Sequence, residues 1–133
     1  MILGIGVDLC EVDRVERLLE KDRERFLRRV FGKREASYCD ARRRPAMHFA
    51  ARLAAKEAFL KAVGSGWRLG WQQVEVVRGA SGRPDLVLSG RAADALKRRG
   101  VTRAHLTLTH TSGLAVAVVI LEGGTEGRGG AEP

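Results

Sequence analysis

The sequence predicts a single α+β domain in which an antiparallel sheet packs around one long buried helix. Three observations support this fold class. Residues 2–12 alternate as a strand does, two further strand-like segments follow each other near the C-terminus, and residues 45–63 form an alanine-rich helical segment that is apolar on two faces. The 133 residues suit one domain, and 44% of them are hydrophobic, which is enough to build a core.

The first predicted strand, residues 2–12, separates its side chains onto two faces. Asp8 lies on the same face as Gly4 and Gly6, and two glycines leave room there for another backbone or a ligand. Asp13 is then expected to cap a helix that begins near Arg14. The full faces are Leu3, Ile5, Val7 and Leu9 on one side and Ile2, Gly4, Gly6, Asp8 and Cys10 on the other.

A densely charged segment follows. Residues 14–34 hold nine Lys or Arg against four Asp or Glu, and their apolar residues have helical periodicity. Gly32 is expected to end this stretch, and a short helix is expected around 35–41. The run Arg42-Arg43-Arg44 precedes Pro45, which fits the first turn of the long helix over 45–63.

The second half of the chain alternates between strands and one helix. Gly64-Ser65-Gly66 is expected to end the long helix, and turn-forming residues separate the elements after it. The remaining predictions are strands over 72–78 and 84–89, a helix over 91–99, strands over 103–110 and 114–121, the end of the domain (1–122) and a disordered Gly-rich tail over 123–133.

The composition restricts the class of partner. A net charge of +8 attracts nucleic acid, anionic lipid, a phosphorylated small molecule or an acidic protein. Cys10 and Cys39 form no CxxC motif and are interpreted as reduced thiols. Because we find no signal peptide and no apolar run long enough to span a bilayer, we expect a cytoplasmic protein.

Two acids lie in apolar settings. Asp8 ends the run Ile2–Val7, and Glu57 lies inside the alanine-rich helix. Taken separately, Asp8 could be a turn acid, and Glu57 could form an i,i+4 salt bridge with Lys61. Taken together, two such carboxylates from distant parts of the chain favour a shared cation, since a buried carboxylate is costly without a partner.

Three motifs together resemble the holo-acyl-carrier-protein synthase family of 4′-phosphopantetheinyl transferases. Their order and spacing match nearly the whole chain up to Leu121. The motifs are Gly4-Ile5-Gly6-Val7-Asp8-Leu9-Cys10-Glu11-Val12-Asp13-Arg14-Val15, the helix Phe49–Val63 with Gly64-Ser65-Gly66, and Leu106-Thr107-Leu108-Thr109-His110-Thr111.

The resemblance implies transfer of 4′-phosphopantetheine from coenzyme A to a serine of apo-acyl carrier protein, in fatty acid biosynthesis. It implies that Asp8 and Glu57 bind Mg²⁺ and that Lys61 lies near the pyrophosphate, so these three residues are the predicted catalytic set. The physics agrees, because Mg²⁺ takes one or two carboxylates plus phosphate oxygens. The coenzyme A site would comprise Lys61, Gly64, Ser65, Gly66, His110 and Thr111, with Ser65 where the family commonly has Thr.

The resemblance also implies partners. Arg14, Arg25 and Arg28 would dock the acidic carrier protein, and the family is typically a trimer in which Asp8 and His110 can come from different subunits. Two rivals are a transferase that serves polyketide or peptide carriers and a small basic nucleic-acid-binding module. The second rival leaves the two apolar-context acids unexplained, so we expect neither a nucleic-acid nor a membrane partner.

Overall fold

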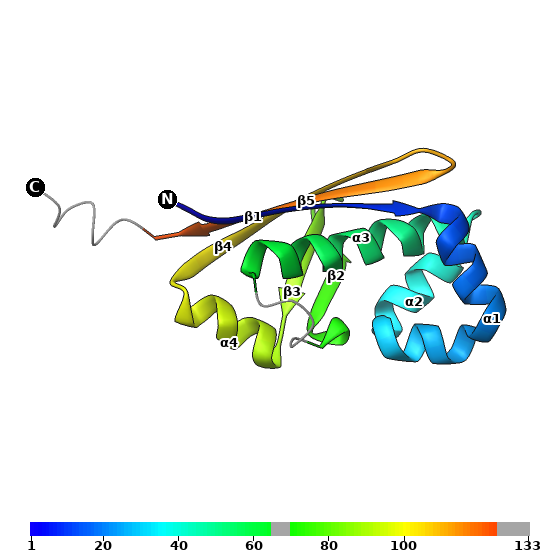
Figure 1. Ribbon diagram of the computed structural model, residues 1–133, viewed down its shortest axis with the longest axis horizontal. Helices are drawn as coiled ribbons and strands as arrows, with labels where there is room; N and C mark the ends of the chain where they lie inside the picture. The colour runs from blue at the N-terminus through cyan, green and yellow to red at the C-terminus, as the bar shows by residue number, and fades with distance from the viewer. Residues whose placement is uncertain (65–69, 125–133) are drawn as a thin grey trace, which may run out of the picture.

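The computed structural model describes residues 1–64 and 70–124. The chain forms one three-stranded antiparallel sheet, one two-stranded hairpin and four α-helices within those ranges (Figure 1). In chain order the elements are β1 (Ile2–Glu11), α1 (Val12–Val30), α2 (Lys33–Asp40), α3 (Pro45–Val63), the 3₁₀ turn η2 (Trp71–Gln73), β2 (Val74–Arg78), β3 (Pro84–Leu88), α4 (Gly90–Arg98), β4 (Val101–His110) and β5 (Leu114–Gly123).

Helix α3 is the centre of the core, which confirms the predicted fold class. It lies across the inner face of the sheet, whose strand order is β1-β5-β4, with α1 and α2 at one end and α4 at the other (Figure 1). Thirteen of its nineteen residues are buried. A helix that is apolar on most sides needs cover on most sides, and the sheet, the hairpin and the flanking helices supply it.

Two glycines of β1 allow the helix to approach closely. A Cβ atom on Gly6 would lie 1.9 Å from the carbonyl oxygen of Ala58, and one on Gly4 would lie 2.3 Å from that of Ala62. Such distances are not possible for real atoms, so only glycine fits at both positions. The predicted close approach on the Asp8 face is therefore that of the helix backbone, and it brings α3 against the strand that carries Asp8.

The strand register determines which residues of β1, β5 and β4 lie side by side on the sheet. Asp8 pairs with Ala117 and Cys10 with Ala115, while His110 of β4 pairs with the same Ala115 from the other side. Asp8 and His110 therefore lie on different strands, β1 and β4, with β5 between them. At the usual strand spacing, β1 and β4 are about 10 Å apart.

Several predicted boundaries were wrong. Helix α1 begins at Val12, so Asp13 lies in its first turn and does not cap it. The helix ends at Val30 with Phe31 as its C-cap, in agreement with the stop expected at Gly32. Its backbone leaves the helical conformation at Asp22, whose carboxylate accepts a hydrogen bond from the Arg25 backbone N–H and so starts a second helical half. Part of the strand expected over 72–78 is the 3₁₀ turn.

The last strand is longer than expected. Gly123, assigned to the tail, is the last residue of β5 and donates its N–H to the carbonyl of Met1. The rest of the predicted tail, from residue 125 onward, lies outside the described residues. Both cysteines are free and buried, as expected. None of the described helices has the length and hydropathy to cross a membrane.

Candidate active site

Asp8 is held where β1 passes the C-terminal half of α3. Its side chain is 10% exposed, and Oδ1 accepts a hydrogen bond of 2.9 Å from Nζ of Lys61. The same ammonium donates to the carbonyl oxygen of Val7 at 3.1 Å. Hydrogen bonding to Asp8 raises the pKa of Lys61. Oδ2 of Asp8 is buried and has no hydrogen-bond partner among the described residues, which is unusual for a carboxylate oxygen.

Glu57 faces Asp8 from the helix. Burial, followed by the neighbouring Asp8 carboxylate, raises the pKa of Glu57 to about 7. Nη2 of Arg14 is 3.8 Å from Oε1 of Glu57 and opposes that effect only in part. The salt bridge between Glu57 and Lys61 that the i,i+4 spacing allows is not the arrangement found, because Lys61 pairs with Asp8 and Glu57 with Arg14.

The donor set fits a hard divalent cation that is completed by substrate. Among residues 1–64 and 70–124, no cluster of three or more His, Cys, Asp or Glu side chains is arranged to hold a metal. Two carboxylates suffice for Mg²⁺ when phosphate oxygens and water supply the other ligands. Burial, together with the neighbouring Asp8, raises the pKa of Glu57, and Oδ2 of Asp8 has no partner among the described residues; a cation between the two carboxylates relieves both.

His110 lies in a different environment, at the end of β4. Its ring packs against His48 at 5.7 Å, and His48 in turn packs edge-on against Tyr38 at 6.1 Å. Burial, then the nearby His110 and Arg52, lowers the pKa of His48. Within one chain, His110 therefore belongs to a separate aromatic and cationic cluster and does not join Asp8 and Glu57.

That cluster gathers guanidinium groups around one phenol ring. Arg42 and Arg52 lie over the Tyr38 ring at 4.3 and 4.2 Å, and Arg78 lies at 5.6 Å. Arg52 is 5% exposed, and its Nε has no hydrogen-bond partner among the described residues. A pocket of ≈ 200 Å³ opens beside these groups. Arg42, one member of the run Arg42–Arg44, is thus part of a built cluster.

Other predicted residues fall in different settings. Gly64 ends α3 in the left-handed conformation, with φ of 80°, as expected for a helix stop. Ser65 and Gly66 lie outside the described residues. Thr111 forms the β4–β5 turn, where its Oγ1 accepts hydrogen bonds from the N–H groups of Gly113 and Leu114.

The predicted docking arginines lie along α1. Arg25 lines a groove of ≈ 440 Å³ at the kink, together with the half-buried Leu18 and Phe26 and the exposed Lys21, Asp22 and Arg29. Arg28 is exposed, and its backbone carbonyl accepts a hydrogen bond from Gln72. Arg14 connects this surface to the carboxylates, because its side chain is half exposed and reaches Glu57.

Sequence reasoning missed two groups of polar residues. Lys56 and Glu35 form an ion pair of 2.8 Å whose side chains are both fully buried. The signal was available for Lys56, which lies in the same alanine-rich context as Glu57. Nothing in the local pattern pointed to Glu35, or to His48 beside His110, because their partners come from other elements.

The site thus sets two facing carboxylates beside a lysine, a donor set that suits a divalent cation and a phosphate group. The family model described as the 4′-phosphopantetheinyl transferase superfamily matches residues 4–119. The chain belongs to this superfamily.

The similar proteins are more specific. A holo-[acyl-carrier-protein] synthase of Anaeromyxobacter sp. (strain K) is 55% identical over 126 residues, which cover 92% of this chain and 98% of that protein. The crystal structure of the same enzyme from Neisseria meningitidis aligns with a TM-score of 0.84 at 32% identity, covering 92% of this chain and 99% of the other. The Bacillus anthracis enzyme, solved in complex with CoA (3′,5′-ADP), aligns at 0.76 and 33% identity, covering 93% and 99%.

Proposed function

We propose that this chain transfers the 4′-phosphopantetheine group of coenzyme A to a serine of apo-acyl carrier protein, releasing adenosine 3′,5′-bisphosphate. Relatives that carry the name of this enzyme, one of them solved with coenzyme A, support the proposal. The observation on which it rests most is the Asp8–Glu57 pair, with a buried carboxylate oxygen left without a partner beside Lys61. In this role the enzyme serves fatty acid biosynthesis in the cytoplasm.

Asp8 and Glu57 are the residues that would hold Mg²⁺. Bound there, the ion would supply positive charge to neutralise the pyrophosphate. Asp8 and Lys61 are hydrogen-bonded before substrate arrives, so the ammonium is already positioned for a phosphate oxygen. We assign Lys61 to stabilising the leaving bisphosphate.

Coenzyme A offers more than the pyrophosphate. We assign Lys61, Gly64, Ser65, Gly66, His110 and Thr111 to its binding, as the family resemblance implies. The arginine cluster around Tyr38 suits a further phosphate, since Arg34, Arg52 and Arg78 line one pocket there. Coenzyme A carries such a group at its 3′ position.

A second copy of the chain would bring the two clusters together. Strand β1 turns Ile5, Val7 and Leu9 outward, each at least half exposed. They pair across the sheet with Ile120, Val118 and Val116, so a continuous apolar strip faces away from α3. Soluble monomers rarely expose such a strip. We propose a homotrimer built on it, with the metal-binding acids of one subunit near His110 of another.

Light scattering tests this assembly directly. We expect three copies per particle for the wild type and a smaller particle for Val7→Asp, with loss of transfer in the variant. A monomeric wild-type enzyme with full activity would contradict the assembly and the composite site together.

The carrier protein is proposed to dock along α1. Its groove combines the apolar Leu18 and Phe26 with three cationic groups, Lys21, Arg25 and Arg29, and one acid, Asp22. An acidic amphipathic helix matches that surface in both shape and charge. Arg14, Arg25 and Arg28 extend the positive surface from the acids at Glu57 to the far end of the helix.

The defining experiment incubates the protein with coenzyme A, Mg²⁺ and a panel of apo-carriers. We expect a mass gain of one phosphopantetheine on acyl carrier protein. A mass gain only on polyketide or peptide carriers would mean that the enzyme performs the same transfer on a different class of carrier. No gain on any carrier, with salt-sensitive binding of DNA or RNA, would favour the nucleic-acid-binding alternative.

A further inference from the structure

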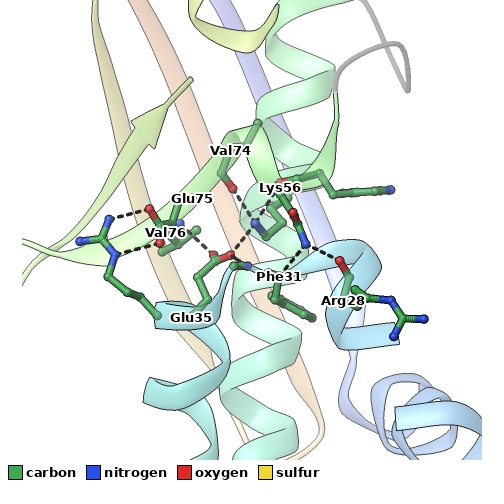
Figure 2. A network of polar contacts seen from close by, with 11 residues as sticks. Arg28, Phe31, Glu35, Lys56, Val74, Glu75 and Val76 are labelled. Carbon is green, nitrogen blue, oxygen red and sulfur yellow. Dashed lines mark hydrogen bonds and ion pairs between the residues drawn. The ribbon is translucent and has the colours of Figure 1, made fainter. Parts of the chain in front are cut away.

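A second charged group lies behind the proposed active site and is used by none of its steps. Nζ of Lys56 donates to Oε1 of Glu35 at 2.8 Å and to the carbonyl oxygens of Trp71 and Val74 at 3.1 and 2.6 Å. All three donors of the ammonium are therefore satisfied (Figure 2).

Glu35 is equally well satisfied. Its Oε2 accepts the backbone N–H of Val76 at 2.9 Å, and its Oε1 accepts that of Gly32 at 3.0 Å in addition to Lys56. The pair thus joins three separate parts of the chain: the start of α2, the middle of α3 and the segment from η2 into β2 (Figure 2).

The same segment is tied to the end of the proposed docking helix. Nε2 of Gln72 donates to the backbone carbonyl of Arg28 and, at 3.1 Å, to that of Phe31. Gln72 lies between Trp71 and Val74, whose carbonyls Lys56 holds. One network therefore runs from the last turn of α1, through η2 and β2, to α3.

Stability alone is a weak reason for such a pair. A buried ion pair costs desolvation that its Coulomb attraction roughly offsets, and apolar residues of similar volume often stabilise as well or better. Desolvation lowers the pKa of Lys56 even with Glu35 beside it. What hydrogen-bonded charges provide and apolar contacts do not is a fixed direction at each atom.

The direction matters because Lys56 precedes Glu57. Successive helical residues point about 100° apart, so fixing Lys56 toward α2 and β2 holds those elements at a set angle from the direction in which Glu57 points. Through Gln72, the network also fixes the end of α1 relative to α3.

We propose that Lys56 and Glu35 are a positioning pair that sets the carrier-docking helix relative to Glu57, and so places the carrier's serine for attack. This inference rests on the proposed function. It assigns the pair an effect on turnover, because misplacing the serine leaves coenzyme A bound as before.

The test replaces the pair with apolar residues of similar length, Glu35→Leu with Lys56→Met. Thermal unfolding is measured together with kcat and with KM for coenzyme A and for the carrier. We expect cooperative unfolding near the wild-type temperature, KM for coenzyme A within about twofold of wild type and kcat lower by about tenfold or more. A folded double variant with wild-type kcat would overturn the proposal.

Two further variants complete the design. Glu35→Gln keeps the shape of the side chain and should fold even if the double variant does not; we expect a lower kcat with unchanged KM for coenzyme A, and wild-type kcat would again overturn the proposal. Asp40→Asn is the matched control, because it removes an exposed ion pair between α1 and α2 through Arg23, and it should change neither stability nor turnover. Absence of transfer by the wild type would refute the proposed function itself, whereas transfer unaffected by the pair refutes only this inference.

Discussion

On the side of α3 that faces α2 and β2, Lys56 and Glu35 have a hydrogen-bond partner for every charged atom. On the side that faces β1, Asp8 keeps one buried oxygen without a partner, and Glu57 has its pKa raised to about 7. Both sides bury ionisable groups, so burial alone does not distinguish a site from a structural pair. The difference is completeness: a satisfied network fixes geometry, and an unsatisfied one is ready to bind a ligand.

The largest expected effect on activity comes from removing the charge of Asp8 or Glu57. Asp8→Asn and Glu57→Gln keep side-chain size and remove charge, so each should lower transfer by about 100-fold or more, as loss of several kcal/mol of transition-state stabilisation implies. Assays with saturating coenzyme A and carrier measure the loss, and circular dichroism checks the fold. Full activity in either variant contradicts the metal assignment.

Separating the two surfaces that carry the site should cost stability as well as activity. Gly6→Ala would place Cβ 1.9 Å from the carbonyl oxygen of Ala58, so β1 and α3 must move apart. We expect a loss of about 1–3 kcal/mol in the free energy of unfolding, measured by urea denaturation.

Gly113→Ala is the matched control, because a Cβ there meets nothing within 4 Å. It should leave the unfolding midpoint nearly unchanged. Equal loss in both variants would mean that the close approach of strand and helix is not what makes Gly6 necessary.

A moderate effect on carrier binding is expected from the docking surface on α1. This surface includes neither the Asp8–Glu57 pair nor the Lys56–Glu35 pair. Arg25→Glu reverses a charge at the groove on α1. We expect KM for the carrier to rise by about tenfold, mainly through slower association, with KM for coenzyme A unchanged. Steady-state kinetics at two salt concentrations measure this, and a matching rise in both KM values would remove α1 from the docking surface.

The effect of Mg²⁺ on stability is the most specific for the comparison. Mg²⁺ at about 100 times its dissociation constant should stabilise the wild type by about 2.7 kcal/mol, through preferential binding to the folded state. Asp8→Asn should lose that thermal shift, whereas Glu35→Gln should keep it. The reverse pattern would place the cation beside Lys56 and Glu35, and would contradict its assignment to Asp8 and Glu57.

Local pattern was enough to predict much of the molecule. Alternation and glycine spacing placed Asp8 on the inner face of its strand, and the apolar surroundings of Glu57 indicated a buried helix. Both rest on periods of two and 3.6 residues, which depend only on neighbours along the chain. The same reasoning placed the helix α3 and its stop at Gly64 correctly.

Errors appeared where distant elements decide the outcome. Spacing favoured Lys61 as the partner of Glu57, yet Lys61 meets Asp8, 53 residues away. Residues 72 and 73, expected in a strand, belong instead to the 3₁₀ turn η2, where Gln72 bonds to the end of α1 and the Trp71 carbonyl accepts from Lys56 of α3. Intrinsic secondary-structure propensity is too weak to determine such features when tertiary packing favours another arrangement.

By itself the chain determined which segments are strands and helices, which faces they bury, and that two acids would be buried where acids are rare. Only the tertiary structure decided which of the buried charges would find a full set of partners. Hydrogen-bond completeness is a property of atoms brought together from α2, α3, β1 and β2, and a linear pattern contains the donors and acceptors but not their distances.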